Sequence, residues 1–155
     1  MKTARYNLLV LIIFTVLNLV MILVQSDTYF LFSATIPYYL TFFGYMFDHY
    51  TVGTYALTGM VLAVPLVLAY VACWLLCKRD SRWYTVALVL FAVDCLALLG
   101  LLIMTGNFGG ALFDILIHGW IMVSLVKAIS AAKKLQAMES TPELSDPQVD
   151  FDEIL

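Results

Sequence analysis

Charged side chains are scarce in this sequence of 155 residues: Asp, Glu, Lys and Arg together make up 12% of it, while hydrophobic residues make up 63%. A water-soluble domain is about one quarter charged and about half apolar. So few charges cannot cover the apolar surface of such a chain in water, and the mean hydropathy of +0.96 agrees with this. The scarcity excludes an ordinary soluble domain and indicates an integral membrane protein.

Motifs of the common catalytic, metal and redox sites are also missing. The sequence has no HExxH and no CxxC, and its only histidines are His49 and His118. Its cysteines are odd in number and lie in apolar runs, so they do not form a disulfide framework. No basic groove interleaved with aromatics suggests nucleic acid as a partner. We therefore expect no enzyme activity, no cofactor and no metal.

What the sequence has instead is four long apolar runs, which cover residues 7–24, 54–77, 84–104 and 111–131. At about 1.5 Å per residue each run can cross the hydrocarbon of a bilayer as a helix. The first run is longer than the apolar core of a signal peptide, and no small-x-small cleavage site follows it, so we expect it to be retained. The sequence predicts an all-α polytopic membrane protein whose four transmembrane helices form one domain, residues 1–138.

The segment between the first two runs, residues 25–53, is rich in aromatic residues and has no Lys or Arg. Pro37 suits the first turn of a helix, and Ser33 or Thr35 is a candidate cap. The stretch 37–47 is too short to span a membrane. A short Tyr-rich helix is typical of the membrane–water interface, so we predict an interfacial aromatic helix here. A lid over a pocket is the alternative.

Topology follows from the basic residues, which avoid both the aromatic segment and the turn 105–110. They lie at the two ends of the chain and between the second and third runs: Lys2, Arg5, Lys78, Arg79, Arg82, Lys127, Lys133 and Lys134. Under the positive-inside rule both termini are cytoplasmic. Six of the eleven acidic residues follow Met138, so we expect residues 139–155 to be a disordered acidic tail. This tail is either simply solvated or docks a cytoplasmic partner protein.

Four polar residues fall in one layer of the predicted bundle: Asp94 of the third span, Asp114 and His118 of the fourth, and Asn18 of the first. Asp114 and His118 are four residues apart and so share one helix face. The short turn makes the third and fourth spans antiparallel neighbours, which brings Asp94 within about one turn of His118 in depth. Thr15 lies at the depth of Asp94.

Ionisable groups within a membrane are costly, so this layer has either a structural or a functional role. In the structural interpretation these residues form hydrogen bonds between helices. Alternatively the layer conducts a proton or an ion, since His titrates near neutral pH. A metal or catalytic site and a small-ligand or lipid site are further alternatives. Gly59, Gly100 and Gly119 are places where helices can approach closely.

The motifs SDTYFLFS at 26–33 and IPYY at 36–39, together with the pattern Asp114-x-x-x-His118-x-Trp120, resemble those of small uncharacterised four-span membrane proteins of bacteria. The resemblance implies a bacterial cytoplasmic membrane and four spans, and no activity. We therefore expect a structural or interaction subunit of a membrane assembly. Its partners are the bilayer and either a second copy or another membrane protein. The alternative is a proton- or ion-coupled carrier or channel subunit that uses the polar layer.

Overall fold

The computed structural model describes residues 2–26, 28–30, 32–48, 54–106 and 112–140. Within these ranges the chain forms five helices and no strand: α1 (Lys2–Leu23), α2 (Thr35–Asp48), α3 (Tyr55–Leu76), α4 (Trp83–Thr105) and α5 (Leu112–Ser140). All but α2 are long and apolar enough to cross a membrane. The predicted all-α fold, with four spans and a short helix between the first two, is confirmed.

The helices are longer than the apolar runs that predicted them at both ends of the chain. α1 begins at Lys2 rather than at Asn7, and α5 continues past Ala131 to Ser140. Hydropathy marks only the part of a helix that is apolar, whereas the helix itself runs on through polar residues that can reach the interface. The rest of the predicted acidic tail, residues 141–155, lies outside the described residues.

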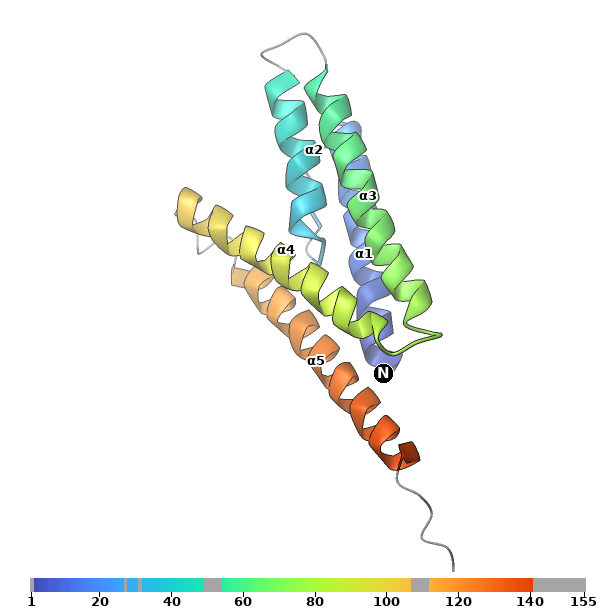
Figure 1. Ribbon diagram of the computed structural model, residues 1–155. Coiled ribbons are helices and arrows are strands. Elements are labelled where there is room, and N and C mark those ends of the chain that lie inside the picture. Colours follow the sequence, from blue (N-terminus) through green and yellow to red (C-terminus); the bar gives the residue numbers. More distant parts are fainter. Residues whose placement is uncertain (1, 27, 31, 49–53, 107–111, 141–155) are drawn as a thin grey trace, which may run out of the picture.

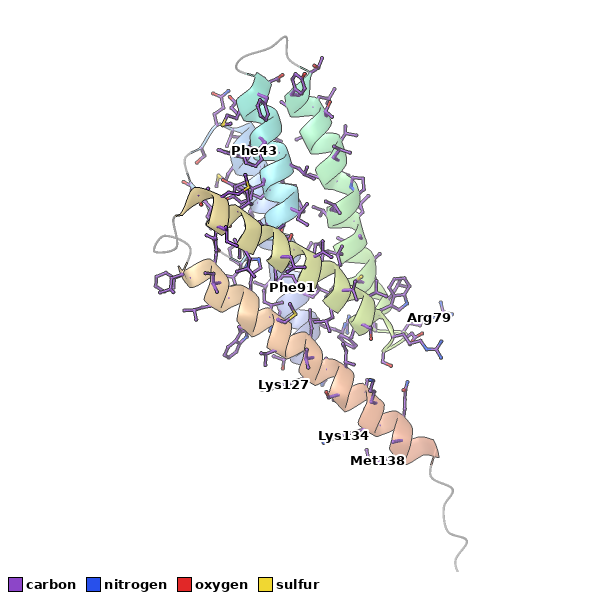
Figure 2. The ribbon with its side chains drawn as sticks, turned by 60° about the vertical axis from the view of Figure 1, so that its left-hand side comes forward. Phe43, Arg79, Phe91, Lys127, Lys134 and Met138 are labelled. Carbon is purple, nitrogen blue, oxygen red and sulfur yellow. The ribbon has the colours of Figure 1, made fainter. Side chains whose placement is uncertain are left out.

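The spans alternate in direction, so the start of α1, the turn from α3 to α4 and the end of α5 lie toward the same end of the molecule (Figure 1). Arg79, Lys127 and Lys134, labelled in Figure 2, belong to this basic end. α1, α2 and α3 lie side by side, and α4 and α5 cross this group obliquely (Figure 1). Residues of α1, α3, α4 and α5 form the buried apolar core.

The segment that follows α1 turns back along α1 before α2 begins. The side-chain amide of Asn18 donates to the carbonyl of Phe30 at 2.7 Å, and its oxygen accepts from the N–H of Phe30 at 2.8 Å. Further along, the N–H of Ala34 donates to the hydroxyl oxygen of Thr15 at 2.8 Å. From Phe30 to Ala34 the chain thus moves from the level of Asn18 to that of Thr15. Thr15 lies about 12 Å from the end of α1 at 1.5 Å per residue, so α2 begins deep within the bundle.

α2 packs lengthwise against α3, with which it forms a helical hairpin (Figure 1). Its first turn touches Asp94, which is near the middle of α4. A helix lying flat at the membrane surface, as the aromatic composition suggested, would touch only the ends of the spans. The short helix is therefore re-entrant: the chain enters the bundle as a non-helical segment and leaves it as α2.

Two glycines allow α2 and α3 to pack closely. A Cβ atom added to Gly44 would lie 2.5 Å from the carbonyl oxygen of Tyr55, and one added to Gly59 would collide with the carbonyl group of Leu40. Real Cβ atoms do not approach backbone atoms so closely, and backbone cannot move aside as a flexible side chain can. Glycine is thus required on both faces of this contact.

The predicted close approach is therefore confirmed at Gly59, whereas no other described helix of this chain closely approaches the other two glycines. A Cβ atom added to Gly100 or Gly119 would meet nothing within 4 Å. Both lie on exposed faces of their helices. A glycine in a span indicates a helix contact only if it faces one, and sequence does not define helix rotation.

Candidate functional site

Asp94 holds the start of α2. Its side chain is buried, and its two oxygens accept the backbone N–H groups of Thr35 and Ile36, each at 2.8 Å. The first N–H groups of a helix have no partner within the helix, and a side chain just before the helix normally accepts them. Here a residue of another span does so. Two accepted hydrogen bonds and the positive end of the α2 dipole suit an ionised carboxylate.

His118 reaches the same carboxylate from α5. Its Nδ1 is 2.8 Å from the backbone carbonyl of Asp114, and its Nε2 is 3.4 Å from Oδ2 of Asp94. Since a carbonyl oxygen can only accept, Nδ1 carries a proton. The imidazole stacks on Phe91, with 5.2 Å between ring centroids and 10° between planes. These contacts fix the ring with Nε2 toward Asp94.

Nε2 of His118 can be either protonated or unprotonated. When Nε2 is protonated, His118 is an imidazolium and forms an ion pair with Asp94. When Nε2 is not protonated, its lone pair faces a carboxylate oxygen, which is unfavourable. The hydroxyl oxygen of Thr35, 3.3 Å from Nε2, can then donate a hydrogen bond to it. The site therefore has a hydrogen-bonding pattern for each protonation state.

Asp114 lies one turn closer to the start of α5, toward the end of the bundle opposite the basic one. Its Oδ2 accepts the hydroxyl of Tyr29 at 3.4 Å, and that hydroxyl accepts a bond from Ser33 at 3.3 Å. Burial raises the pKa of Tyr29 above its ordinary value, because the phenolate would lose water; the hydrogen bond from Ser33 opposes this, and the Asp114 carboxylate raises it further. A polar chain thus leads from Asp94 through His118 and Asp114 to Tyr29.

The four residues of the predicted polar layer do not all lie together. Asp94 and His118 are in contact, and Asp114 meets His118 through its backbone carbonyl. Asn18 lies apart, since both of its polar side-chain atoms are bonded to Phe30. The polar layer therefore consists of the Asp94–His118 pair with an extension through Asp114, and of Asn18, which separately binds the backbone of the re-entrant segment.

Three residues that our sequence analysis did not assign to the site belong to it: Thr35, Tyr29 and Ser33. Ser33 and Thr35 were predicted as helix caps, and their hydroxyls instead face Tyr29 and His118. In the sequence, Pro37 indicated only that a helix starts here. The sequence did not indicate that the start of this helix contacts a carboxylate of a distant span.

His118, although buried, also borders a groove on the lipid-facing side of α4 and α5. It lines a small groove between α4 and α5, about 200 Å³ in volume, whose other walls are apolar side chains such as Leu98 and Met122. Among the described residues, no group of three His, Cys, Asp or Glu side chains is placed to hold a metal ion. Comparisons with protein-family models, with curated proteins and with solved structures found no match. The geometry of the site itself is therefore the basis for a functional proposal.

Proposed function

We propose that this chain is a structural or interaction subunit of a membrane assembly, without catalytic activity. The observation that carries the proposal is the use of Asp94, whose two oxygens bind the first N–H groups of α2. Thr15 and Asn18 bind the backbone that leads to α2. Backbone that is not helical is tolerated at membrane depth only where protein groups satisfy it. The buried polar residues are thus explained by the fold, as expected of a protein that presents a rigid surface to partners.

The proposed location is the cytoplasmic membrane of a bacterium, with both termini in the cytoplasm. The gathering of the basic residues at one end of the bundle supports this orientation, because loops rich in Lys and Arg stay on the cytoplasmic side. The resemblance to small four-span bacterial proteins supports the compartment.

A photo-crosslinking experiment in the native membrane tests the subunit proposal. A photoreactive amino acid is placed at Leu96 or Ile103 on the exposed face of α4, and at Leu57 or Leu68 on that of α3. A subunit should give a discrete protein adduct, either with itself or with another protein, from one of these faces. Lipid adducts alone from all four positions would contradict the proposal.

A second candidate is a proton-coupled carrier or channel subunit, which the position of His118 Nε2 beside Asp94 favours. The pair can hold or release one proton, and Asp114 and Tyr29 continue the polar chain away from the pair. Four helices enclose little space, so transport would involve a second copy or a partner.

Proton flux in liposomes separates the two candidates. A carrier should conduct protons in the wild type, and His118→Gln should abolish that conduction while the folded protein remains. A structural subunit should show no flux above empty liposomes in either form. Infrared and NMR titration of the wild type, Asp94→Asn and His118→Gln then shows whether the two groups titrate as a coupled pair.

A further inference from the structure

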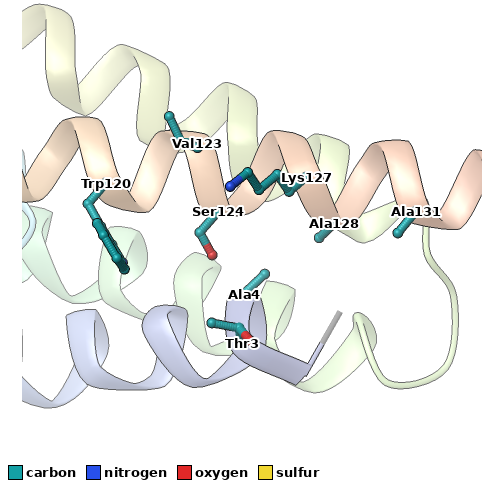
Figure 3. A pocket seen from close by; sticks show the side chains of 8 residues that line it. All are labelled: Thr3, Ala4, Trp120, Val123, Ser124, Lys127, Ala128 and Ala131. Carbon is teal, nitrogen blue, oxygen red and sulfur yellow. The ribbon is translucent and has the colours of Figure 1, made fainter.

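A groove of about 450 Å³ lies between the start of α1 and the second half of α5, away from the Asp94 site. Small side chains, Ala4 on α1 and Ala128 and Ala131 on α5, form its floor (Figure 3). Nearby, the side-chain amide of Asn7 donates to the hydroxyl of Ser124 at 3.0 Å and ties the two helices together. The small residues therefore leave an open channel between α1 and α5, which the Asn7–Ser124 hydrogen bond holds together.

Polar side chains line the middle of the groove, and apolar side chains line both of its ends. Thr3, Ser124 and Lys127 lie in the middle, Trp120 and Val123 at the inner end, and Ala128 and Ala131 toward the basic end of the bundle (Figure 3). In Figure 3 the amine of Lys127 lies over the groove beside Ser124 rather than pointing away from it. The groove therefore holds one cation and two hydroxyl groups, with an apolar stretch from Val123 to Trp120 on their inner side.

Lys127 is a cation without an anionic partner in the described part of the chain, where the one ion pair joins His118 and Asp94. It lies about 22 Å along α5 from Leu112 at 1.5 Å per residue. The hydrocarbon core of a bilayer is about 30 Å thick, so this helix position lies roughly 8 Å inside the boundary at the basic end, a distance that a lysine side chain can span to reach a lipid phosphate. Lys2, Lys133 and Lys134 extend the positive charge beyond it.

We propose that this groove binds one anionic phospholipid from the leaflet at the basic end of the bundle. Its phosphate pairs with Lys127 and accepts from the hydroxyls of Thr3 and Ser124. One acyl chain runs inward from there along Val123 and ends against Trp120, and the small side chains of Ala128 and Ala131 leave room for the headgroup toward the basic end. A basic pocket between membrane helices on this side is a typical headgroup site. A cation within reach of lipid phosphates, with an apolar channel leading inward, matches the charged headgroup and the acyl chain of a lipid. A free anion would need only the cation, and a soluble peptide would not need the apolar channel.

The test counts lipids bound to the purified full-length protein by native mass spectrometry in detergent. Phosphatidylglycerol and phosphatidylcholine are added separately, and inorganic phosphate is added as a competitor. One Lys contributes about 1 kcal/mol, so the wild type should prefer phosphatidylglycerol about fivefold. Lys127→Gln should remove most of this preference. Lys134→Gln, which changes an exposed residue outside the groove, should keep it.

A second variant tests the shape of the groove independently of the charge. Ala131→Leu narrows the partly exposed entrance of the groove at the basic end and keeps Lys127, so it should weaken the binding of both lipids. Equal binding of the two lipids by the wild type, or an unchanged preference in Lys127→Gln, would overturn the proposal. Displacement of the lipid by millimolar phosphate would show that the groove is a simple anion site. A dimer in which the second copy fills the groove would show that its occupant is protein. Either result would also overturn the lipid proposal.

Discussion

Among the single residues, Asp94 has a role that its residue type alone does not indicate. An acidic residue in a membrane span is commonly a proton or ion site. Here its oxygens are occupied by the N–H groups of Thr35 and Ile36, and the imidazole of His118 lies against one of them. The same carboxylate therefore holds the start of α2 and lies beside an imidazole, and variants must separate the two contacts.

Asp94→Asn should destabilise the protein even though the side chain keeps its shape. An amide has one acceptor oxygen, and its NH₂ group would face the second backbone N–H of α2. The loss of one such hydrogen bond to a charged group should lower the free energy of unfolding by about 1–3 kcal/mol, and Asp94→Ala should cost more. Denaturant titration in mixed micelles measures this.

Asp48→Asn is the matched control for that substitution. Asp48 also accepts a backbone N–H, that of Tyr55 at 3.0 Å, but the bond is exposed to solvent. We expect a change of less than about 1 kcal/mol there, since water can replace the bond. Equal effects at the two positions would show that Asp94 has no special role as the anchor of α2.

Tyr29 should make the stability of the protein sensitive to alkaline pH. Its pKa is raised above the ordinary value of 10.0 in the folded state, chiefly by burial. The neutral phenol therefore stabilises the fold below about pH 10, and this contribution is lost as the pH rises further, because the unfolded chain ionises first. The slope from one such group is at most about 1.4 kcal/mol per pH unit.

The measurement compares unfolding of the wild type and Tyr29→Phe at several pH values from 8 to 11. The wild type should lose stability more steeply above about pH 10 than the variant does. Tyr6→Phe, at an exposed position, serves as the control and should follow the wild type. Tyr29 is 36% exposed, so solvent screening reduces the effect, but parallel curves for the wild type and Tyr29→Phe would contradict the partial burial of the Tyr29 hydroxyl beside Asp114.

At the level of elements, the hairpin of α2 and α3 depends on the contact at Gly44 and Gly59. Alanine at either position would place a methyl group against backbone of the other helix. We expect each substitution to cost about 1–3 kcal/mol, typical of overpacking, and to loosen α2 from α3. Thermal unfolding in detergent measures the loss.

Gly100→Ala is the control within a neighbouring span, because its methyl group would meet nothing within 4 Å. It should be neutral or stabilise the helix by about 0.5–1 kcal/mol, as Ala usually does relative to Gly. If Gly44→Ala were as harmless as Gly100→Ala, the close packing of the hairpin would be disproved.

The elements show which parts of the fold sequence can predict. The four spans followed from hydropathy because a bilayer requires long apolar helices. The short helix followed from Pro37 and the polar residues before it. Its re-entrant position did not follow, because that depends on contacts between Ala34 and Thr15 and between Thr35 and Asp94, which are far apart in the chain.

The candidate site was predictable in depth but not in its contacts. Counting residues from the turn brought Asp94 within about one turn of His118. Whether the two face each other depends on helix rotation, which an evenly apolar span does not reveal. Asn18 illustrates this, since it has a suitable depth and yet binds the backbone of Phe30 instead.

For the whole molecule, the gathering of basic residues at one end predicts its orientation in the membrane. In a variant without native cysteines, a cysteine at Thr105 should react with a membrane-impermeant maleimide added to intact cells. A cysteine at Ser81, in the basic turn, should react only after the cells are opened. The reverse pattern would refute the orientation with both termini in the cytoplasm.

The anchoring of α2 by Asp94 inside the bundle is best tested by hydrogen exchange of the amides of Thr35 and Ile36, measured by NMR in lipid nanodiscs. We predict slow exchange in the wild type, and exchange at least about tenfold faster in Asp94→Ala with the amides of α3 unchanged. Fast exchange of Thr35 and Ile36 in the wild type, like that of an exposed turn, would show that Asp94 does not anchor α2.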